Sequence, residues 1–435
     1  MSATFSQDLA PWVQEIEAQV YGNPQRAIDA SRQLLKQCTE PAQVAYVYEQ
    51  LGFAHLILGE HRLSCLFYEQ ARAFDPDNMY VLANLAHAQY ELGEHAQARI
   101  SGAAALRLKD GSACNNASTP VAALQPRYQG RHHLIAFSLH GNKPRYCEMA
   151  VLNVLAARRH LPDFVCRFYV DASTPPAVLA RLQTLGAQCI AVDEQARPLP
   201  ATFWRFLAMD DAQADCVLVR DVDALIDARE AWCVNAWRES GLPFHIIRDD
   251  CCHTELILAG LLGIRAGVVR DMALRMESFV QTTGAAAHKR YGDQLFLRTI
   301  LWPLVRAQSL THDRIYAYGE QVQSVAYVAQ QDEGPCNSFI GANHATCEMA
   351  CTLDKLAPGV LPFVTITDAT GNLVCRYSMQ KDSNAADTNR WSIHLPHSYQ
   401  AKLTDGQWHY DVALLPGQQV LQGEGSTDAV VLGFA

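Results

Sequence analysis

The chain has 435 residues, enough for about two to four domains of ordinary size. Its hydrophobic content of 49% and charged content of 18% exclude a disordered protein. The net charge of −10 argues against a nucleic-acid-binding surface, which needs a concentrated basic face, but it does not argue against a nucleotide ligand, for which a metal ion and a few local arginines suffice.

The sequence shows no pattern for export or membrane insertion. Residues 1–10 lack a basic stretch followed by an apolar one, and no apolar run approaches the ~20 residues that span a bilayer. The 14 cysteines are scattered through regular elements, so we expect reduced thiols. These features predict a cytoplasmic protein with no membrane span.

Residues 1–112 contain a repeat with a 34-residue offset. The offset pairs Leu51 with Leu85 and Gly59 with Gly93, and Pro76 closes the first unit. The pattern resembles the tetratricopeptide repeat, with one good copy at about 45–78, a degraded copy at about 79–110 and a poorer helix pair at about 8–43. An unrelated helical bundle is the alternative. Such a domain is a binding surface, which suggests a protein or peptide acceptor or a homodimer.

A linker rich in small and polar residues is predicted at 111–131, followed by alternating strands and helices. This alternation predicts a parallel sheet covered on both faces, which we assign to a domain at 130–345. The expected strands are 133–139, 164–170, 189–192, 216–219 and 243–247, and the expected helices are 145–159, 176–185, 202–209 and 271–281.

The end of the chain changes character and predicts a small antiparallel β domain at 358–435. Short strand-like runs alternate with turn signals such as the Pro-Gly pair at 416–417. The fold class is therefore a multi-domain α/β protein: an N-terminal α-helical repeat domain, a central α/β domain and a small β domain. The expected strands are 363–366, 373–377, 391–395, 408–415 and 419–422.

The most informative motif is the acidic pair Asp221 and Asp223, which ends an apolar run that reads as a buried strand. Because side chains alternate along an extended backbone, the two carboxylates are expected on one side where the strand leaves the sheet. Paired carboxylates there suit a hard divalent cation that also holds a diphosphate. The pair therefore points to an enzyme that uses a nucleotide-activated donor.

Residues on both sides of this pair extend the hypothesis. Arg205, between aromatic residues on a predicted helix, is expected to reach a diphosphate or a uracil ring, with a surface arginine as the alternative. Arg220 precedes the pair and should point away from it. It either binds the donor or forms a structural ion pair with a carboxylate of the protein. Asp293 is either a helix-capping residue or a carboxylate that faces the acceptor, the second substrate to which the activated group would be transferred. His312 is a candidate third ligand of the metal ion.

The order of these motifs resembles metal-dependent glycosyltransferases of the GT-A type over about residues 130–345. The resemblance implies that Asp221, Asp223 and His312 hold Mn²⁺ or Mg²⁺, which stabilises the leaving nucleoside diphosphate. If the anomeric centre inverts, Asp293 and then Asp249 are the candidate bases. The motifs that carry the resemblance are Arg-Asp-Val-Asp at 220–223, His-Ile-Ile-Arg-Asp at 245–249, Gly-Leu-Leu-Gly at 260–263, Asp-Gln at 293–294 and His-Asp at 312–313. The donor-binding residues that the resemblance implies are Arg205, Arg220, Arg248, Gly260 and Gln294.

Rival interpretations remain open. A structural zinc site at Cys336, His344, Cys347 and Cys351 competes with a strand at 339–341 that closes the central domain. The absence of nucleophile-elbow, Walker and dinucleotide-binding motifs disfavours hydrolases, kinases and dehydrogenases. Two other functions compete: a repeat-type adaptor with an inactive nucleotide-binding module, and nucleotidyl transfer.

Overall fold

The computed structural model describes residues 4–115, 132–193, 198–325, 339–353, 356–381, 389–416 and 433–434. It divides the chain into two compact units. The first contains Met1–Arg131, Phe206–Val219 and Arg229–Val328, and the second contains His132–Arg205, Arg220–Ala228 and Ala329–Ala435. Among the described residues, no helix has the length and apolar character needed to cross a membrane.

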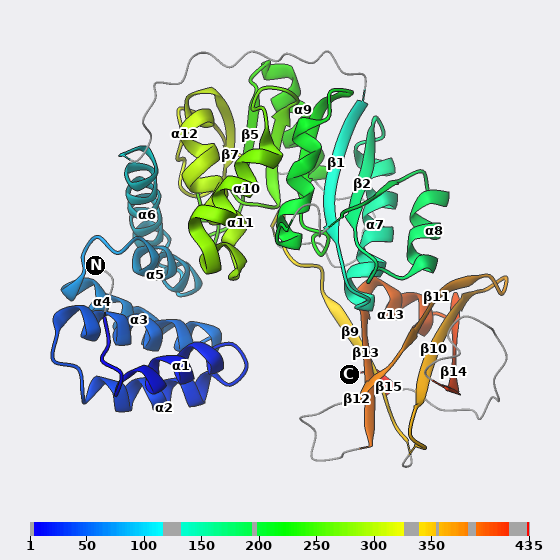
Figure 1. The fold of residues 1–435 in the computed structure, drawn as a ribbon, viewed down its shortest axis with the longest axis horizontal. Coiled ribbons are helices and arrows are strands. Elements are labelled where there is room, and N and C mark those ends of the chain that lie inside the picture. Colours follow the sequence, from blue (N-terminus) through cyan, green and yellow to red (C-terminus); the bar gives the residue numbers. More distant parts are fainter. Residues whose placement is uncertain are drawn as a thin grey trace. The chain divides into compact units, whose positions relative to one another are not determined.

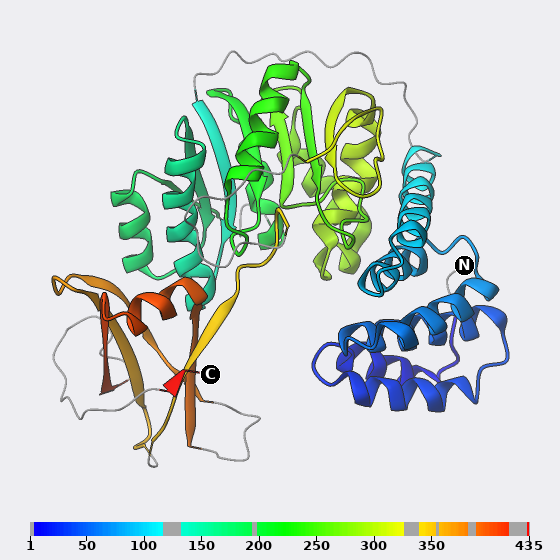
Figure 2. The ribbon, with the colours of Figure 1, turned by 180° about the vertical axis from the view of Figure 1, so that it is seen from behind.

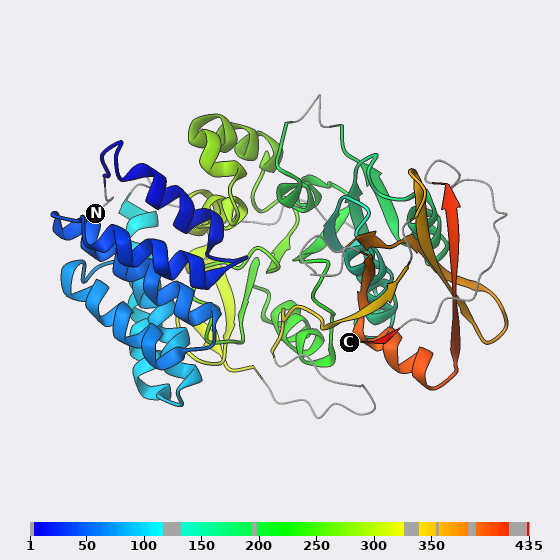
Figure 3. The same cartoon turned by 90° about the horizontal axis from the view of Figure 1, so that it is seen from below.

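The amino-terminal helices form three antiparallel pairs, as the repeat predicts (Figures 1 and 3). Small residues allow close approach inside the second pair: a Cβ atom on Gly52 would lie 2.8 Å from Cδ1 of Tyr68. The Ser64 hydroxyl donates to the Gly52 carbonyl at 2.9 Å across the same contact. The helices are α1 (Ala10–Gln19), α2 (Pro24–Leu35), α3 (Pro41–Ile57), α4 (His61–Phe74), α5 (Met79–Glu91) and α6 (His95–Asn115).

The central region is a mostly parallel sheet of eight strands in the order β3-β2-β1-β4-β6-β5-β7-β8. The strands β1, β2 and β3 pair in parallel, as do β5, β7 and β8, whereas β6 is antiparallel to β5. The strands are β1 (His132–Leu139), β2 (Phe164–Val170), β3 (Gln188–Ala191), β4 (Ala214–Arg220), β5 (Phe244–Arg248), β6 (Leu261–Arg265), β7 (Ser309–Asp313) and β8 (Gln321–Gln323).

Helices connect these strands, as the alternating pattern predicts. β5 and β7 are buried along their whole lengths, which is typical of strands in a sheet that is covered on both faces. The main helices are α7 (Pro144–His160), α8 (Pro176–Thr184), the 3₁₀ helix η1 (Ala201–Asp210), α9 (Ala228–Ser240), α10 (Met272–Thr283), α11 (Gly292–Phe296) and α12 (Trp302–Val305).

The carboxyl-terminal region of the second unit forms two small sheets, with the orders β11-β10-β14 and β12-β13-β9-β15. Figure 2 shows α13 lying against these strands. A buried carboxylate, Glu148 of α7, accepts hydrogen bonds from the hydroxyls of Tyr377 and Tyr399 in this region, each at 2.6 Å, and also from Arg181 of α8 at 2.7 Å. The elements are β9 (Thr346–Thr352), β10 (Val360–Asp368), β11 (Leu373–Ser378), β12 (Gln380–Lys381), β13 (Arg390–Pro396), α13 (His397–Thr404), β14 (Trp408–Pro416) and β15 (Gly433–Phe434).

Three local predictions need correction or fall outside the described residues. The segment 339–341 forms a bend and a turn instead of a strand, and the first strand after it, β9, pairs with β13 of the carboxyl-terminal region. Helix α6 continues to Asn115, so residues 111–115 of the predicted linker are helical, and residues 116–131 lie outside the described residues. The strand predicted at 419–422 lies outside the described residues.

Two glycines of α6 provide a test of how the repeat helices pack within the first unit. A Cβ atom on Gly102 would lie 2.1 Å from Cε1 of Tyr316, whereas Gly111 has nothing within 4 Å. We expect Gly102→Ala to lower the free energy of unfolding by about 1–3 kcal/mol through overpacking. Gly111→Ala, the matched control, should be neutral or stabilising by up to about 1 kcal/mol because alanine favours the helix. Urea unfolding measures both, and a neutral Gly102→Ala would contradict the packing.

Candidate functional site

The acidic pair lies in a turn that directly follows β4, as predicted. The side chain of Asp221 is 48% exposed and that of Asp223 is 20% exposed, so one carboxylate faces solvent and the other is largely enclosed. Burial and the negative charge of Asp221 raise the pKa of Asp223, and they outweigh the opposing effects of a backbone hydrogen bond and of two arginines. A cation at this turn would therefore relieve an unfavourable concentration of negative charge.

The turn is held in place by hydrogen bonds from two other segments of the second unit. Asn153, which is fully buried on α7, donates to the carbonyl of Val222 at 2.9 Å and accepts from the backbone N–H of Ile226 at 3.2 Å. The backbone N–H of His344 donates to the carbonyl of Asp223 at 2.7 Å. The positions of the two carboxylates are thus fixed by the fold before any ligand binds.

Two arginines accompany the acidic pair. Arg205 of η1 is 4% exposed, which excludes the surface-arginine alternative, and its guanidinium donates to a carboxylate oxygen of Asp221 and to the carbonyl of Arg220. Its backbone N–H donates to the hydroxyl of Ser138 at 3.1 Å, near the end of β1. Arg145 lies 3.8 Å from a carboxylate oxygen of Asp223. Arg205 thus links the ends of β1 and β4.

Arg145 is a site residue that the sequence reasoning did not identify. It lies in the first turn of α7, which follows the loop after β1, and loops at the carboxyl ends of strands are where α/β proteins bind ligands. The position of Arg145 after the first strand is the only feature of the sequence that points to it. One arginine in a helix is not informative unless it is known to lie near the acidic pair. Arg220, which was predicted as a donor residue, is 2% exposed, and this burial agrees with its structural alternative.

Arg248 and Asp249 occupy buried positions in the first unit. The Arg248 guanidinium donates to Asp313 at 2.9 Å and to the carbonyls of Leu256 and Tyr318, so all three of its nitrogens are occupied by the protein. These contacts favour a structural role over donor binding.

The Asp249 carboxylate is fully buried and faces two arginines. Arg314 donates to it at 2.8 Å, and a guanidinium nitrogen of Arg229 lies 3.6 Å away. A carboxylate held in this way is poorly placed to face an acceptor hydroxyl, because it is fully buried and already accepts a hydrogen bond from Arg314.

Of the remaining predicted residues of the first unit, Asp293 and Gly260 are buried and Gln294 is half-buried. Asp293 is 6% exposed and accepts a hydrogen bond from the backbone N–H of Gln294 at 2.9 Å in the first turn of α11. Gly260 lies in a turn that precedes β6. At Gly263 a Cβ atom would lie 3.0 Å from that of His245, so this glycine permits close packing of the core.

His312 lies inside β7, where its Nδ1 is 2.8 Å from Nε2 of His245 and its ring packs edge-on against Trp232. Burial lowers its pKa to about 4, so the imidazole is neutral, which is the form that binds metals. His312 belongs to the first unit and the acidic pair to the second. Its role as the third metal ligand stays a prediction.

The rival zinc site receives no support from the residues that the structure describes. Cys347 and Cys351 on β9 contact different partners, the carbonyl of Pro396 and the sulfur of Met379. Neither cysteine joins His344 in a cluster of metal-binding geometry among the described residues, and Cys336 lies outside them.

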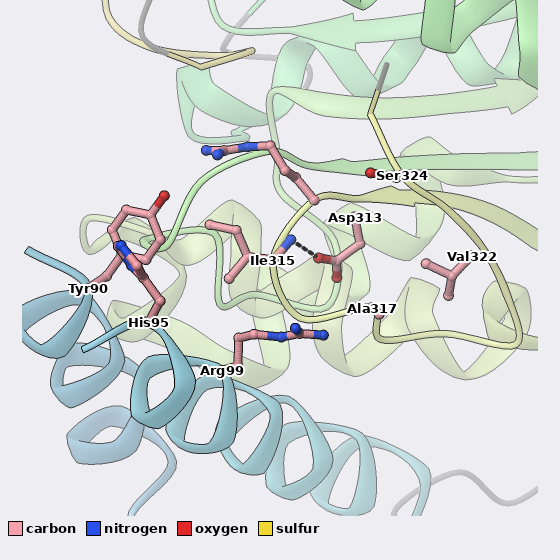
Figure 4. A pocket seen from close by; sticks show the side chains of 9 residues that line it. Tyr90, His95, Arg99, Asp313, Ile315, Ala317, Val322 and Ser324 are labelled. Atoms are coloured by element: carbon pink, nitrogen blue, oxygen red, sulfur yellow. Dashed lines mark hydrogen bonds between the residues drawn. The ribbon is translucent and has the colours of Figure 1, made fainter. Parts of the chain in front are cut away.

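A separate pocket of about 430 Å³ lies in the first unit (Figure 4). Tyr90 and His95 face it from the repeat helices, and Asp313 and Ile315 face it from the segment that begins at the end of β7. None of the residues predicted to bind the donor, the metal or the acceptor lines this pocket.

No family model and no curated protein matches the sequence. Solved structures similar to parts of the chain include the TPR2B domain of yeast Sti1 in complex with pHsp70, with 20% identity, a TM-score of 0.23 and coverage of 26% of this chain and 88% of that one. A mutant O-GlcNAc transferase of Thermobaculum terrenum has 17% identity, a TM-score of 0.24 and coverage of 43% and 42%. The galactosyltransferase LgtC, bound to donor and acceptor sugar analogues, has 20% identity, a TM-score of 0.31 and coverage of 41% and 73%.

The raised pKa of Asp223 predicts an unusual stabilising substitution. An acid whose pKa is raised by folding holds its proton more tightly in the folded state, so its ionised form costs stability above that pKa. With divalent cations chelated, Asp223→Asn should therefore raise the thermal midpoint at pH 7. The gain should vanish below about pH 4, where the carboxyl is protonated in both states. Differential scanning calorimetry at the two pH values measures this, and a lower midpoint for the variant at pH 7 would contradict it.

The pairing of Asp249 with two arginines predicts a structural penalty. Asp249→Ala should lower the free energy of unfolding by about 3 kcal/mol, because it removes the fully buried carboxylate that pairs with Arg314 and with the largely buried Arg229. Asp215→Ala serves as the control, since Asp215 pairs with Arg265 at 3.0 Å but is 30% exposed. The control should cost at most about 1 kcal/mol. Equal losses in urea unfolding would show that Asp249 is not a special position.

Proposed function

We propose that this protein is a glycosyltransferase that moves a sugar from a nucleotide-sugar donor, expected to be UDP-linked, to a protein, peptide or glycan acceptor. The observation that carries the proposal is the fixed turn with Asp221 and Asp223 at the end of β4, together with Arg205 and Arg145. These residues combine ligands for a hard divalent cation with guanidinium groups that suit phosphate oxygens.

The position of the turn in the sheet supports a nucleotide ligand. From β1 the chain adds β2 and β3 on one side and then crosses to place β4 on the other side of β1. Open α/β sheets bind ligands outside the carboxyl ends of their strands at such a change of direction. Arg205 links these two strands, since it contacts Ser138 of β1 and the carbonyl of Arg220 of β4.

The residues of the turn suggest how the donor is held. Asp221 and Asp223 would bind Mn²⁺ or Mg²⁺, which would supply charge stabilisation for the departing nucleoside diphosphate. Arg205 and Arg145, which contact the acidic pair, would donate to phosphate oxygens, and Asn153 would keep the turn rigid so that little reorganisation is needed on binding.

The acceptor side of the reaction requires a base if the anomeric centre inverts. We keep Asp293 as the first candidate, because Asp249 already faces two arginines. The helical repeats are proposed to bind a protein or peptide acceptor or a second copy of the chain, since stacked helix pairs present extended binding surfaces.

The test of this proposal is a donor screen followed by product analysis. One nucleotide sugar should raise the thermal midpoint in the presence of Mn²⁺ but not without it, because a ligand that binds only the native state stabilises it. The protein should then release nucleoside diphosphate. Release of pyrophosphate would instead identify nucleotidyl transfer, and stabilisation by no donor together with tight binding of a partner protein would identify an adaptor.

Substitution of the acidic pair gives the sharpest variant. The Asp221→Asn and Asp223→Asn double variant should lose at least about 10²–10³-fold in kcat/KM for the donor identified above, as expected when electrostatic stabilisation of the transition state is removed. Asp163→Asn is the control. This exposed acid lies just before the first residue of β2, whereas the proposed site lies at the carboxyl ends of strands. Unchanged transfer by the double variant in added Mn²⁺ would refute the proposed site.

A further inference from the structure

A group of three side chains with metal-binding chemistry lies outside the proposed glycosyl-transfer site. His87 and Glu91 come from α5 of the repeat domain, and Cys251 comes from the turn after β5. One ligand atom from each residue lies within 4.8 Å of the other two. All three residues belong to the first unit.

The helix supplies two of these ligands in a regular way. Residues four positions apart on a helix lie on the same face one turn apart, so His87 and Glu91 present an imidazole and a carboxylate side by side. The thiol of Cys251 approaches them from the turn after β5, where it also lies 3.4 Å from a carboxylate oxygen of Asp250. Imidazole nitrogen, carboxylate oxygen and thiolate sulfur are each zinc ligands, and three protein ligands leave a fourth position for water.

The geometry is close to that of a bound site. Bond lengths of about 2.0–2.3 Å in a tetrahedral zinc site place the ligand atoms about 3.3–3.8 Å apart. Separations of up to 4.8 Å therefore require each side chain to move by about 1 Å, which small rotations about side-chain bonds provide.

The backbone that carries these ligands is firmly held. The Tyr316 hydroxyl donates to the carbonyl of Cys251, and the ring of Tyr316 packs on Gly102 of α6. Lys109 of α6 donates to the carbonyl of Thr254 at 2.8 Å and to Glu255 at 2.7 Å. The repeat helices and the turn after β5 are thus joined by several contacts, so the three ligands do not depend on a chance approach of two mobile surfaces.

We propose that His87, Glu91 and Cys251 form a zinc site that joins the last repeat helix pair to the turn after β5. Binding releases the proton of the Cys251 thiol to solvent and forms a zinc–thiolate bond without any redox step. The thiolate distinguishes this site from the acidic pair at Asp221 and Asp223, which offers oxygen ligands and suits Mn²⁺ or Mg²⁺.

Cobalt titration of the metal-free full-length chain tests the proposal by a readout that is independent of catalysis. Co²⁺ bound to a thiolate gives a charge-transfer absorption band in the near ultraviolet, whereas Co²⁺ on carboxylates does not. We expect this band to saturate at one equivalent and to be displaced by Zn²⁺. It should disappear in Cys251→Ser and persist in Cys252→Ser, a matched control because Cys252 is the adjacent, exposed thiol.

A second variant guards against misfolding. Glu91 is exposed, so Glu91→Gln should fold normally while it weakens zinc binding more than about tenfold, because loss even of residues outside the ligand shell typically costs 10–100-fold. A chromophoric chelator in competition with the protein measures the zinc affinity. The proposal is overturned if the wild-type chain shows no thiolate band, if the band survives in Cys251→Ser, or if Glu91→Gln binds zinc as tightly as the wild type.

Discussion

The buried amide of Asn153 fixes the turn on which the proposed activity depends. Its side chain binds the backbone on both sides of Asp223, so the fold holds two carboxylates close together although their mutual repulsion opposes this. The fold therefore concentrates the negative charge of Asp221 and Asp223 at one fixed turn, directly after β4. In the proposed function, a divalent cation and a diphosphate would turn that charge into a binding site.

The two arginines explain how this charge is tolerated in the absence of a ligand. Arg205 pairs with Asp221, and Arg145 lies near Asp223, so the turn is partly neutralised before any cation binds. We propose that the same guanidinium groups serve the donor phosphates, because arginine offers several hydrogen-bond donors in a planar fork. The electrostatics of the turn would then link folding stability to ligand binding in a single set of residues.

Much of the fold could be predicted from the sequence because local patterns determine it. The 34-residue repeat located three helix pairs, and the alternation of strands and helices located the sheet. The segment 339–341 was misread because a short apolar run does not distinguish a strand from a turn, and β9 was missed because its pairing with β13 is non-local. Periodicity carries no information about such pairings.

The candidate site was only partly accessible from the sequence for a related reason. Asp221, Asp223 and Arg205 stand close together in the chain, and the structure brings them together in one unit. Arg145 and Asn153 reach the turn from α7, about 70 residues earlier in the chain, and only the folded structure reveals them. Conversely, Arg248 and Asp249 resemble ligand residues in sequence, but buried ion pairs occupy them.

The most direct test of the metal–diphosphate site is calorimetric titration of UDP at increasing Mn²⁺ concentrations. If one turn holds both ligands, each must increase the affinity of the protein for the other by the same factor. We expect UDP affinity to rise at least about tenfold between metal-free and Mn²⁺-saturated protein. UDP binding of equal affinity with and without Mn²⁺ would contradict the assignment of Asp221 and Asp223 to a shared metal–diphosphate site.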